Sequence, residues 1–370
     1  MQFIDLAAQQ QRIRRQLDER IKKVLDHGQY ILGPEIRELE EKMAALMNMP
    51  YAVSVASGTD ALLMPLLAEK VGPGDAVFTS TFTFIATAGA IALTKATPVF
   101  VDIDPDTFNI DPDKLEAAIE QTLAKKKLTP KGVIPVDLFG QPADYQAIQA
   151  IADRHRLFVL EDAAQSFGAS QNGKKAGALA SMSGTSFFPA KPLGGYGDGG
   201  MIFTDSKMMH EQLLSIRVHG QGADKYTNVR VGINGRMDSL QAAVLLAKLE
   251  IFSEEIALRQ QVADRYDRLL AGSVQTPKIL KENISAWAQY SVLHPRRDEV
   301  IQKLRENGIP TAIYYPIPLH LQAAFADLGY REGDFPIAER IAKEIFSLPM
   351  HPYLEKADQE KIAGLLARCK

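Results

Sequence analysis

The sequence has almost no cysteine and no long hydrophobic run. Its single cysteine, Cys369, stands next to the C-terminus, which excludes a disulfide framework within the chain and a cysteine-rich metal site. No stretch approaches the roughly 18 uninterrupted apolar residues of a membrane span, and the first 20 residues lack the apolar core of a signal peptide. These absences predict a protein that is neither exported nor inserted into a membrane, and a reducing cytoplasm is its expected location.

The sequence also lacks a strong charge imbalance, an internal repeat and a low-complexity segment. Its net charge is -3 at pH 7, with 24% charged and 46% hydrophobic residues. This balance gives no general attraction to nucleic acid or to an acidic membrane surface, so neither is expected among its partners. The 370 residues suffice for a large core and predict about two domains.

From residue 52 onward, short apolar runs alternate with helical segments, which is typical of a mostly parallel sheet. We therefore predict an α/β fold in which a large domain, residues 1–245, contains one seven-stranded sheet. The expected strands cover 52–56, 76–80, 98–102, 132–138, 157–161, 184–188 and 200–204, and the helices between them cover 60–70, 84–94, 112–124, 143–155 and 207–218.

The two ends of the chain have a different pattern. Apolar residues at helical spacing predict a helix over 7–27, and Pro34 is expected to open a second helix at its first position. One or two long helices should follow residue 236, with Asp238 as the N-cap. They lead to a smaller domain, residues 246–370, in which we expect strands at 287–294 and 311–315, a helix over 297–307 and a Pro-rich interruption at 347–354.

A lone lysine between two prolines follows one of the expected strands. In SFFPAKPLGGYGDGG, Pro189 and Pro192 bar the strand from continuing on either side of Lys191, and a glycine-rich turn follows. An amine held rigidly and partly out of water can lose its proton near neutral pH and attack a carbonyl, which a Schiff-base lysine must do. The alternative is a solvated lysine in a loop.

A possible phosphate site lies where the first strand meets a helix, in Ser57-Gly58-Thr59-Asp60. A glycine-containing turn at a helix N-terminus presents free backbone N–H groups and the positive end of the helix dipole. A phosphate can bind there. The alternative is an N-cap without a ligand.

Two further strand ends carry residues suited to an aromatic ring. Asp162, in EDAAQS, ends an apolar strand, and ligands of open α/β sheets bind beyond the carboxyl ends of the strands. Its carboxylate could stabilise the protonated nitrogen of a pyridoxal ring, or it could simply cap the next helix. Phe84, in TFTF, could offer a flat apolar neighbour at the same edge, although a core phenylalanine is the default interpretation.

Together these stretches resemble, from about residue 3 to residue 354, the sugar aminotransferases of the DegT/DnrJ/EryC1/StrS family, which have the aspartate-aminotransferase fold of pyridoxal phosphate enzymes. The similarity extends over blocks that occur in the family's order. These blocks are GQYILGPE, SGTDAL, TFTFIATA, VFVDIDPDTFNID, PVDLFGQPAD, EDAAQSFGA, SFFPAKPLGGYGDGG, GINGRMD, YYPIPLHLQ and SLPMHPYL.

The resemblance implies pyridoxal 5'-phosphate as the cofactor, with pyridoxamine phosphate as its intermediate form. Lys191 matches the Schiff-base lysine, and Asp162 matches the partner of the pyridinium nitrogen. Asn234, in GINGR, matches an asparagine that reaches the phosphate from the neighbouring subunit, which implies a homodimer with two shared active sites. The other matches are Gln165 over the ring, Phe84 stacked on the ring, and Gly58, Thr59 and Ser186 around the phosphate.

The implied reaction is the transfer of an amino group from L-glutamate, which leaves as 2-oxoglutarate, to a nucleotide-linked keto-sugar. The blocks are most similar to the branch that aminates carbon 3 of UDP-2-acetamido-2-deoxy-3-oxo-glucuronate, for bacterial surface polysaccharide such as lipopolysaccharide O-antigen. For this acidic sugar the candidate ligands are Arg236, Tyr315 and His320, with Tyr30 as a further candidate. The alternatives are an Arg236 that anchors its own helix and a His320 and Tyr30 that only pack.

Three other functions stay open at this point. The first is amination of a neutral 3-oxo or 4-oxo deoxy sugar carried on dTDP or UDP. The second is a pyridoxal phosphate-dependent sugar dehydratase, although the dehydratase branch has histidine in place of the lysine and this chain keeps Lys191. The third is a non-catalytic regulator that binds the cofactor. Asp198 replaces a glutamate found in many relatives, and we expect this difference to be neutral.

Overall fold

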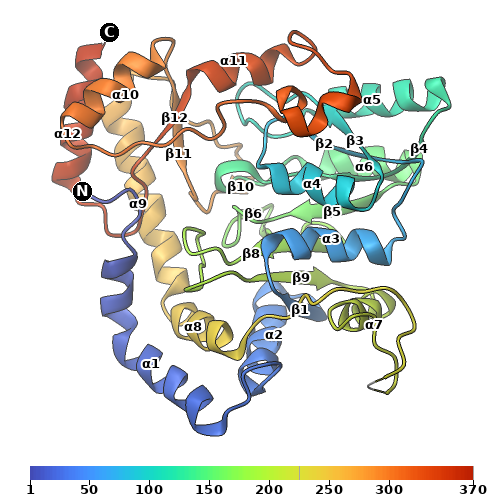
Figure 1. Cartoon of the computed structure of the whole chain (residues 1–370). Coiled ribbons are helices and arrows are strands. Elements are labelled where there is room, and N and C mark those ends of the chain that lie inside the picture. Colours follow the sequence, from blue (N-terminus) through green and yellow to red (C-terminus); the bar gives the residue numbers. More distant parts are fainter. Residues whose placement is uncertain (225, 370) are drawn as a thin grey trace.

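A seven-stranded sheet lies at the centre of the computed structural model, which describes residues 1–224 and 226–369 (Figure 1). The strand order is β1-β9-β8-β5-β4-β2-β3; β9 runs antiparallel to both of its neighbours, and the remaining pairs are parallel. The prediction of a large, mostly parallel sheet is therefore confirmed. The strands are β1 (Tyr51–Val55), β2 (Asp75–Ser80), β3 (Thr97–Val101), β4 (Thr129–Ile134), β5 (Phe158–Asp162), β8 (Met182–Ser186) and β9 (Gly200–Thr204).

Helices cover both faces of this sheet because successive strand residues point to opposite sides and both sides are apolar. Val77 and Ile202 face α3, α4 and α7, whereas Phe78 faces α5 and α6, and Phe203 faces α2 and α8. The helices are α1 (Leu6–His27), α2 (Pro34–Met47), α3 (Gly58–Ala68), α4 (Ile85–Leu93), α5 (Pro112–Lys125), α6 (Tyr145–His155), α7 (Lys207–Ile216) and α8 (Ser239–Leu249).

The expected helix starts agree with the structure. Pro34 lies in the first turn of α2, where its missing N–H costs nothing, and Asp238 precedes α8 without a side-chain capping bond. Ser57 caps α3 by accepting a hydrogen bond from the backbone N–H of Asp60 at 3.1 Å. This cap fixes the entry of α3 at the carboxyl end of β1.

The C-terminal part builds a second hydrophobic cluster, which includes Trp287, Tyr290 and Phe346 and lies around a two-stranded sheet. The long helix α9 joins this cluster to the central sheet (Figure 1). The boundary between residues 245 and 246 stays a prediction. The elements are α9 (Phe252–Leu270), β11 (Tyr290–Leu293), α10 (Arg297–Glu306), α11 (Pro336–Glu344), β12 (Ile345–Leu348) and α12 (Lys356–Leu366).

The expected strand at 311–315 is wrong. Within it only Ala312 pairs, in a single bridge to Ser347, and the antiparallel partner of β11 is β12, where no strand was expected. Pro310 and Pro316 bracket the segment and remove the N–H groups that a ladder would need. The three apolar residues of 345–348 instead pack on both sides of the small sheet, and all four residues of the segment are buried.

Short elements complete the fold. The remaining elements are a three-stranded sheet of β6 (Ser170–Gln171), β7 (Lys174–Lys175) and β10 (Asn283–Ile284), and the 3-10 turns η1 (Leu138–Gly140), η2 (Leu319–Leu321), η3 (Ala323–Leu328) and η4 (Ala367–Cys369).

None of the helices in residues 1–224 and 226–369 combines the length and apolar character that crossing a membrane requires.

Gly184, in the middle of β8, lets α3 approach the sheet closely. A Cβ at this position would lie 2.7 Å from the carbonyl oxygen of Ala61 in α3. We therefore expect Gly184→Ala to shift α3 and to lower the free energy of unfolding by about 1–3 kcal/mol, as overpacking does. Urea unfolding followed by circular dichroism measures this difference.

The matched control is Gly364→Ala in α12, where a Cβ would meet nothing within 4 Å. That change should leave the free energy of unfolding unchanged or raise it by up to about 1 kcal/mol, because alanine favours a helix over glycine. If Gly184→Ala were as stable as the wild type, the close approach of α3 would not constrain the fold.

Candidate active site

Asp162 and Lys191 lie at the same edge of the sheet, where the parallel strands β5 and β8 end. Asp162 is the last residue of β5 and pairs in register with Gly184 of β8. The chain leaves β8 at Ser186 and forms a turn in which the backbone N–H of Lys191 donates to the carbonyl of Phe188 at 2.9 Å. The turn returns Lys191 to Asp162, and the two side chains interact electrostatically.

Burial prepares the Lys191 amine for chemistry. It lowers the pKa of Lys191 from its usual value, and the negative charge of Asp162, which acts in the opposite direction, does not reverse this shift. A larger fraction of the amine is therefore neutral near physiological pH than for a solvated lysine. A neutral amine is the form that attacks a carbonyl.

Asp162 is buried, and two donors hold its carboxylate. The Thr87 hydroxyl donates to Oδ2 at 2.8 Å, and the backbone N–H of Ala164 donates to Oδ1 at 3.2 Å. Burial raises the pKa of Asp162, while Thr87, Ala164 and the charge of Lys191 lower it part of the way. The sequence interpretation missed Thr87, whose signal was a hydroxyl residue in the first turn of α4, the helix that follows the end of β2.

The turn between β1 and α3 forms a cradle beside this edge. A Cβ at Gly58 would lie 2.6 Å from the Cβ of Ser186, so only glycine allows the start of α3 to approach the end of β8 so closely. Thr59 follows in the first turn of α3, whose free N–H groups and dipole favour an anion. Gly58, Thr59 and Ser186 are therefore neighbours, as their expected shared role requires.

Aromatic and amide side chains gather on the other side of the edge. Phe84 is 55% exposed although it immediately precedes α4, and its ring centroid lies 6.2 Å from that of Tyr315. Gln165 is held at both ends: its Oε1 accepts from the backbone N–H of Phe139 at 2.7 Å, and its Nε2 donates to the Tyr315 hydroxyl at 3.2 Å. These contacts bring Tyr315 from the C-terminal part of the chain to the Asp162 edge.

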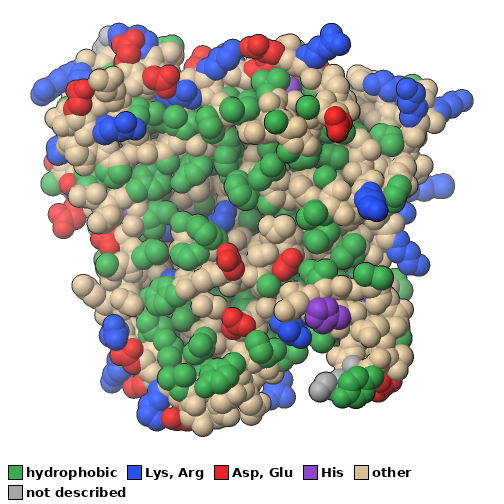
Figure 2. Space-filling model, viewed as in Figure 1, with side chains coloured by type: hydrophobic (Ala, Val, Ile, Leu, Met, Phe, Trp, Pro, Cys, Tyr) green, Lys and Arg blue, Asp and Glu red, His purple; other side chains and the backbone are tan. Residues whose placement is uncertain are grey.

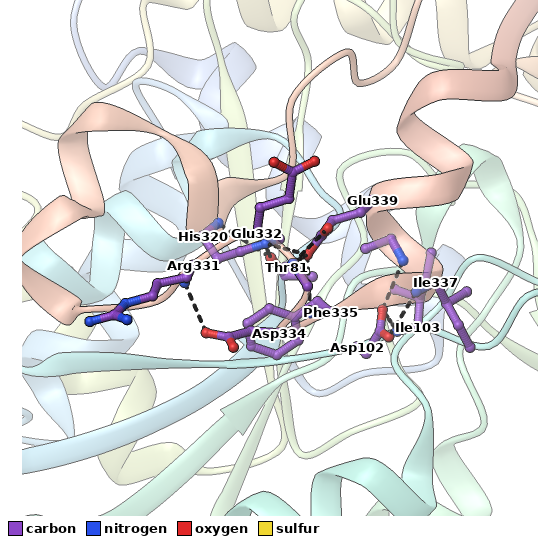
Figure 3. A network of polar contacts seen from close by, with 12 residues as sticks. Thr81, Asp102, Ile103, His320, Arg331, Glu332, Asp334, Phe335, Ile337 and Glu339 are labelled. Carbon is purple, nitrogen blue, oxygen red and sulfur yellow. Dashed lines mark hydrogen bonds and ion pairs between the residues drawn. The ribbon is translucent and has the colours of Figure 1, made fainter.

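The structure corrects the expectation that His320 binds substrate. His320 is only 2% exposed, and both ring nitrogens have protein partners: Nδ1 lies 2.7 Å from the Thr81 hydroxyl, and Nε2 lies 3.1 Å from Glu339 Oε1 (Figure 3). Burial lowers the pKa of His320, which favours a neutral ring that donates to Glu339 and accepts from Thr81. His320 therefore fixes the segment that follows Tyr315 against the strand edge.

Three residues that were expected to bind cofactor or substrate make no polar or ring contact with Lys191 in the described part of the chain. Asn234 is exposed, Tyr30 is 47% exposed, and the Nε of Arg236 is buried without a hydrogen-bond partner among the described residues. No hydrogen bond, ion pair or ring contact in the described chain joins any of them to Lys191 or Asp162. The segment that contains Asn234 and Arg236 is nevertheless anchored near the cradle, because the N–H of Ala56 donates to the carbonyl of Gly235 at 3.0 Å.

Comparison with known proteins gives full-length similarity. The chain is 50% identical, over 99% of both sequences, to the UDP-2-acetamido-2-deoxy-3-oxo-D-glucuronate aminotransferase of Pseudomonas aeruginosa. The crystal structure of a DegT DnrJ EryC1 StrS aminotransferase from Brucella abortus superposes with a TM-score of 0.98 at 48% identity and covers 100% of this chain and 99% of that chain.

A third similarity concerns the cofactor. A sugar aminotransferase of Streptococcus pneumoniae, solved in its pyridoxal phosphate form, superposes with a TM-score of 0.89 at 26% identity, covering 96% of this chain and 94% of that chain. The model of the DegT/DnrJ/EryC1/StrS aminotransferase family matches residues 11–367. Because this match spans both the lysine turn and the Asp162 edge, the chain belongs to the DegT/DnrJ/EryC1/StrS aminotransferase family.

Proposed function

We propose that the chain is a pyridoxal phosphate-dependent aminotransferase that transfers the amino group of L-glutamate to carbon 3 of UDP-2-acetamido-2-deoxy-3-oxo-glucuronate. The observation that carries the proposal is the position of the half-buried Lys191 beside the buried carboxylate of Asp162 at one strand edge, next to a glycine cradle. The similarity to the Pseudomonas aeruginosa enzyme supports the choice of sugar. A role in surface polysaccharide synthesis follows from that sugar and is part of the proposal.

The residues present fit the cofactor. The cradle at Gly58, Thr59 and Ser186 suits its phosphate, Asp162 suits a protonated ring nitrogen, and the exposed face of Phe84 suits a flat ring. When bound, pyridoxal phosphate supplies a reactive carbonyl and an electron sink for the amino acid's α-carbon.

The side chains of this chain then have separate tasks. Lys191 would supply the neutral amine that binds the cofactor carbonyl, and this amine could carry a proton to and from the α-carbon of the amino acid. Asp162, held by Thr87, would stabilise the protonated form of the ring nitrogen. Gln165, fixed by Phe139 and Tyr315, would help to orient the ring.

A homodimer would complete the site. Asn234 points to solvent, and the segment before it exposes apolar side chains, with Val231 at 91% exposure. Phe84 and Phe188, on either side of the lysine edge, are also more than half exposed. Apolar side chains gather across the middle of the face in Figure 2, while most charged ones lie along its top and sides. Such a surface suits a second copy of the chain that contributes Asn234 to the phosphate.

Arg236 is the proposed ligand of the uronate carboxylate. Its Nε is a buried donor that has no hydrogen-bond partner in residues 1–224 and 226–369, and leaving such a donor unsatisfied is unfavourable unless a ligand accepts from it. A guanidinium can bind a carboxylate through two parallel hydrogen bonds. Tyr30 and Tyr315 are the proposed neighbours of the sugar.

The lysine assignment has a direct test. Borohydride reduction of the cofactor-loaded protein should attach the cofactor to the peptide that contains Lys191, as mass spectrometry of a digest can show. Lys191→Ala should abolish this attachment and transamination while keeping the circular dichroism spectrum, because the residue lies in a ligand-facing turn. Lys207→Ala, at an exposed lysine in α7, is the control and should behave as the wild type. Attachment to any other lysine contradicts the assignment.

Mixing two inactive variants tests the shared site. Lys191→Ala keeps Asn234, and Asn234→Ala keeps Lys191, so one site of each mixed dimer has both residues on the correct chains. We expect transaminase activity to reappear after subunit exchange, which differently tagged chains can demonstrate by co-purification. Subunit exchange without any recovered activity contradicts a site built from two chains.

The choice of sugar is tested in the reverse direction with 2-oxoglutarate. We expect the UDP-linked 3-amino uronate to have a higher kcat/KM than its neutral 3-amino and 4-amino counterparts. Arg236→Ala should lower kcat/KM for the uronate by about 10- to 100-fold, the size of one lost charged hydrogen bond, with little effect on the neutral sugars. Arg15→Ala, at an exposed arginine of α1, is the control. A preference for a neutral sugar would contradict the proposed substrate while leaving aminotransferase chemistry intact.

A further inference from the structure

Two carboxyl groups meet in the core directly behind the Asp162 edge. Asp137, just beyond β4, and Glu161, in β5, are both completely buried, and their carboxyl groups are close enough to hydrogen-bond to each other. Among the described residues no lysine, arginine or histidine forms an ion pair with either of them. Two adjacent negative charges without a cation are strongly unfavourable in such a place.

Asp137 is surrounded by hydrogen-bond donors. The Ser166 hydroxyl donates to Oδ2 at 2.7 Å, while the Tyr145 hydroxyl and the backbone N–H of Ala143 each donate to Oδ1 at 3.0 Å. These donors stabilise the ionised form of Asp137, although burial still raises its pKa to about 7.

Glu161 accepts from three backbone N–H groups of one loop. Gly177 donates to Oε1, and Leu179 and Ala180 donate to Oε2 at 2.8 and 3.4 Å. Burial, followed by the charge of Asp137, raises the pKa of Glu161 well above its usual range. Each carboxyl group thus has its own set of donors, and the contact between the two groups is where a proton can bridge them.

The position of the pair links it to the catalytic edge. Glu161 immediately precedes Asp162, Ser166 immediately follows Gln165, and the backbone N–H of Asp137 donates to the carbonyl of Asp162 at 3.1 Å. We propose that Asp137 and Glu161 share one proton and act as positioning residues that clamp both ends of the segment from Glu161 to Ser166. The positioning of Asp162 and Gln165 rests on the proposed function, whereas the shared proton does not.

Two other titratable groups face the pair. Tyr145 on α6 donates to Asp137, and its pKa lies well above the usual value, so it stays a neutral donor. Asp162 alternates with Glu161 along β5, so its side chain points to the opposite face of the sheet, toward Thr87 and Lys191. Neither group supplies a positive charge, so the proton between Asp137 and Glu161 keeps the pair at a single negative charge.

Infrared spectroscopy tests the shared proton without any activity measurement. At pH 8 the wild-type protein, with and without cofactor, should show the carbonyl-stretch band of a protonated carboxylic acid. Glu161→Gln and Asp137→Asn should each remove this band, because the remaining carboxylate ionises beside a neutral amide. Glu120→Gln, at an exposed glutamate of α5, is the control and should leave the band unchanged. Absence of the band from the wild type, or its survival in both variants, overturns the shared proton.

The pH dependence of stability gives a second readout. The folded pair holds a proton that the unfolded chain releases above pH 5, so the stabilisation from this proton is lost as the pH rises through the raised pKa of the folded pair, near 7 and above. The urea midpoint of the wild type should therefore fall from pH 6 to pH 9. In Glu161→Gln this fall should be smaller. An equal fall in both proteins contradicts the proposal.

Cofactor affinity tests the clamp. Glu161→Gln keeps one carbonyl oxygen that can accept from part of the loop's backbone N–H groups, and its amide nitrogen can donate to Asp137, so its affinity for pyridoxal phosphate should stay closer to the wild-type value than that of Glu161→Ala. Glu161→Ala loses the bridge and should bind about tenfold more weakly or worse. Equal affinities for these two variants would overturn the positioning role. Because binding alone is measured, this result is independent of whether the enzyme aminates the proposed sugar.

Discussion

The withdrawal of Lys191 and Asp162 from water at one strand edge is the constraint on which the site depends. Burial alone moves both groups toward their neutral forms, since it lowers the pKa of the lysine and raises that of the aspartate. A neutral lysine suits attack on a carbonyl, but a neutral aspartate could not hold a protonated ring nitrogen. Thr87 opposes part of this effect, because its hydrogen bond to Oδ2 favours the ionised form of Asp162 and does not involve Lys191.

The fold supplies this edge through close backbone approaches. Gly184 lets α3 pack closely on β8, and Gly58 lets the start of α3 approach Ser186, so the glycine cradle lies directly beside the end of β8 from which the lysine turn begins. On the opposite side, His320 and Glu339 hold the segment after Tyr315 against Thr81 (Figure 3). Asp102 caps the start of α11 in the same region by accepting from the backbone N–H groups of Ile337 and Ala338. Rigid contacts therefore enclose the edge from two distant parts of the chain.

Local sequence patterns predicted the strands and helix starts, because these depend mainly on residues close to one another in the chain. The seven strands and the helix starts follow from apolar runs, capping residues and prolines, and the strand ends then place Lys191, Asp162 and Phe84 at one edge. The prediction of a strand at 311–315 was wrong because strand pairing depends on which distant segment of the chain lies beside β11, and in the structure that segment is β12. The role of His320 was missed for a related reason: its partners Thr81 and Glu339 are 239 and 19 residues away, and a single histidine in a motif reveals neither.

The same reasoning explains why the acid pair behind the site has no sequence signature. Asp137 lies just beyond β4 and Glu161 lies in the neighbouring strand β5. They are 24 positions apart in the printed sequence, and neither differs in its local sequence from an ordinary carboxylate near a strand end. Only the parallel pairing of β4 with β5 brings them together. The carboxyl groups of Asp137, Glu161 and Asp162 then all lie near the end of β5, and their surroundings differ. Asp162 faces Thr87 and Lys191, which favour its ionised form, while the pair behind it can keep one proton. Three full negative charges here would repel one another, and among the described residues no lysine, arginine or histidine forms an ion pair with Asp137 or Glu161, so a proton held by that pair lowers the electrostatic cost of placing Asp162 at this edge.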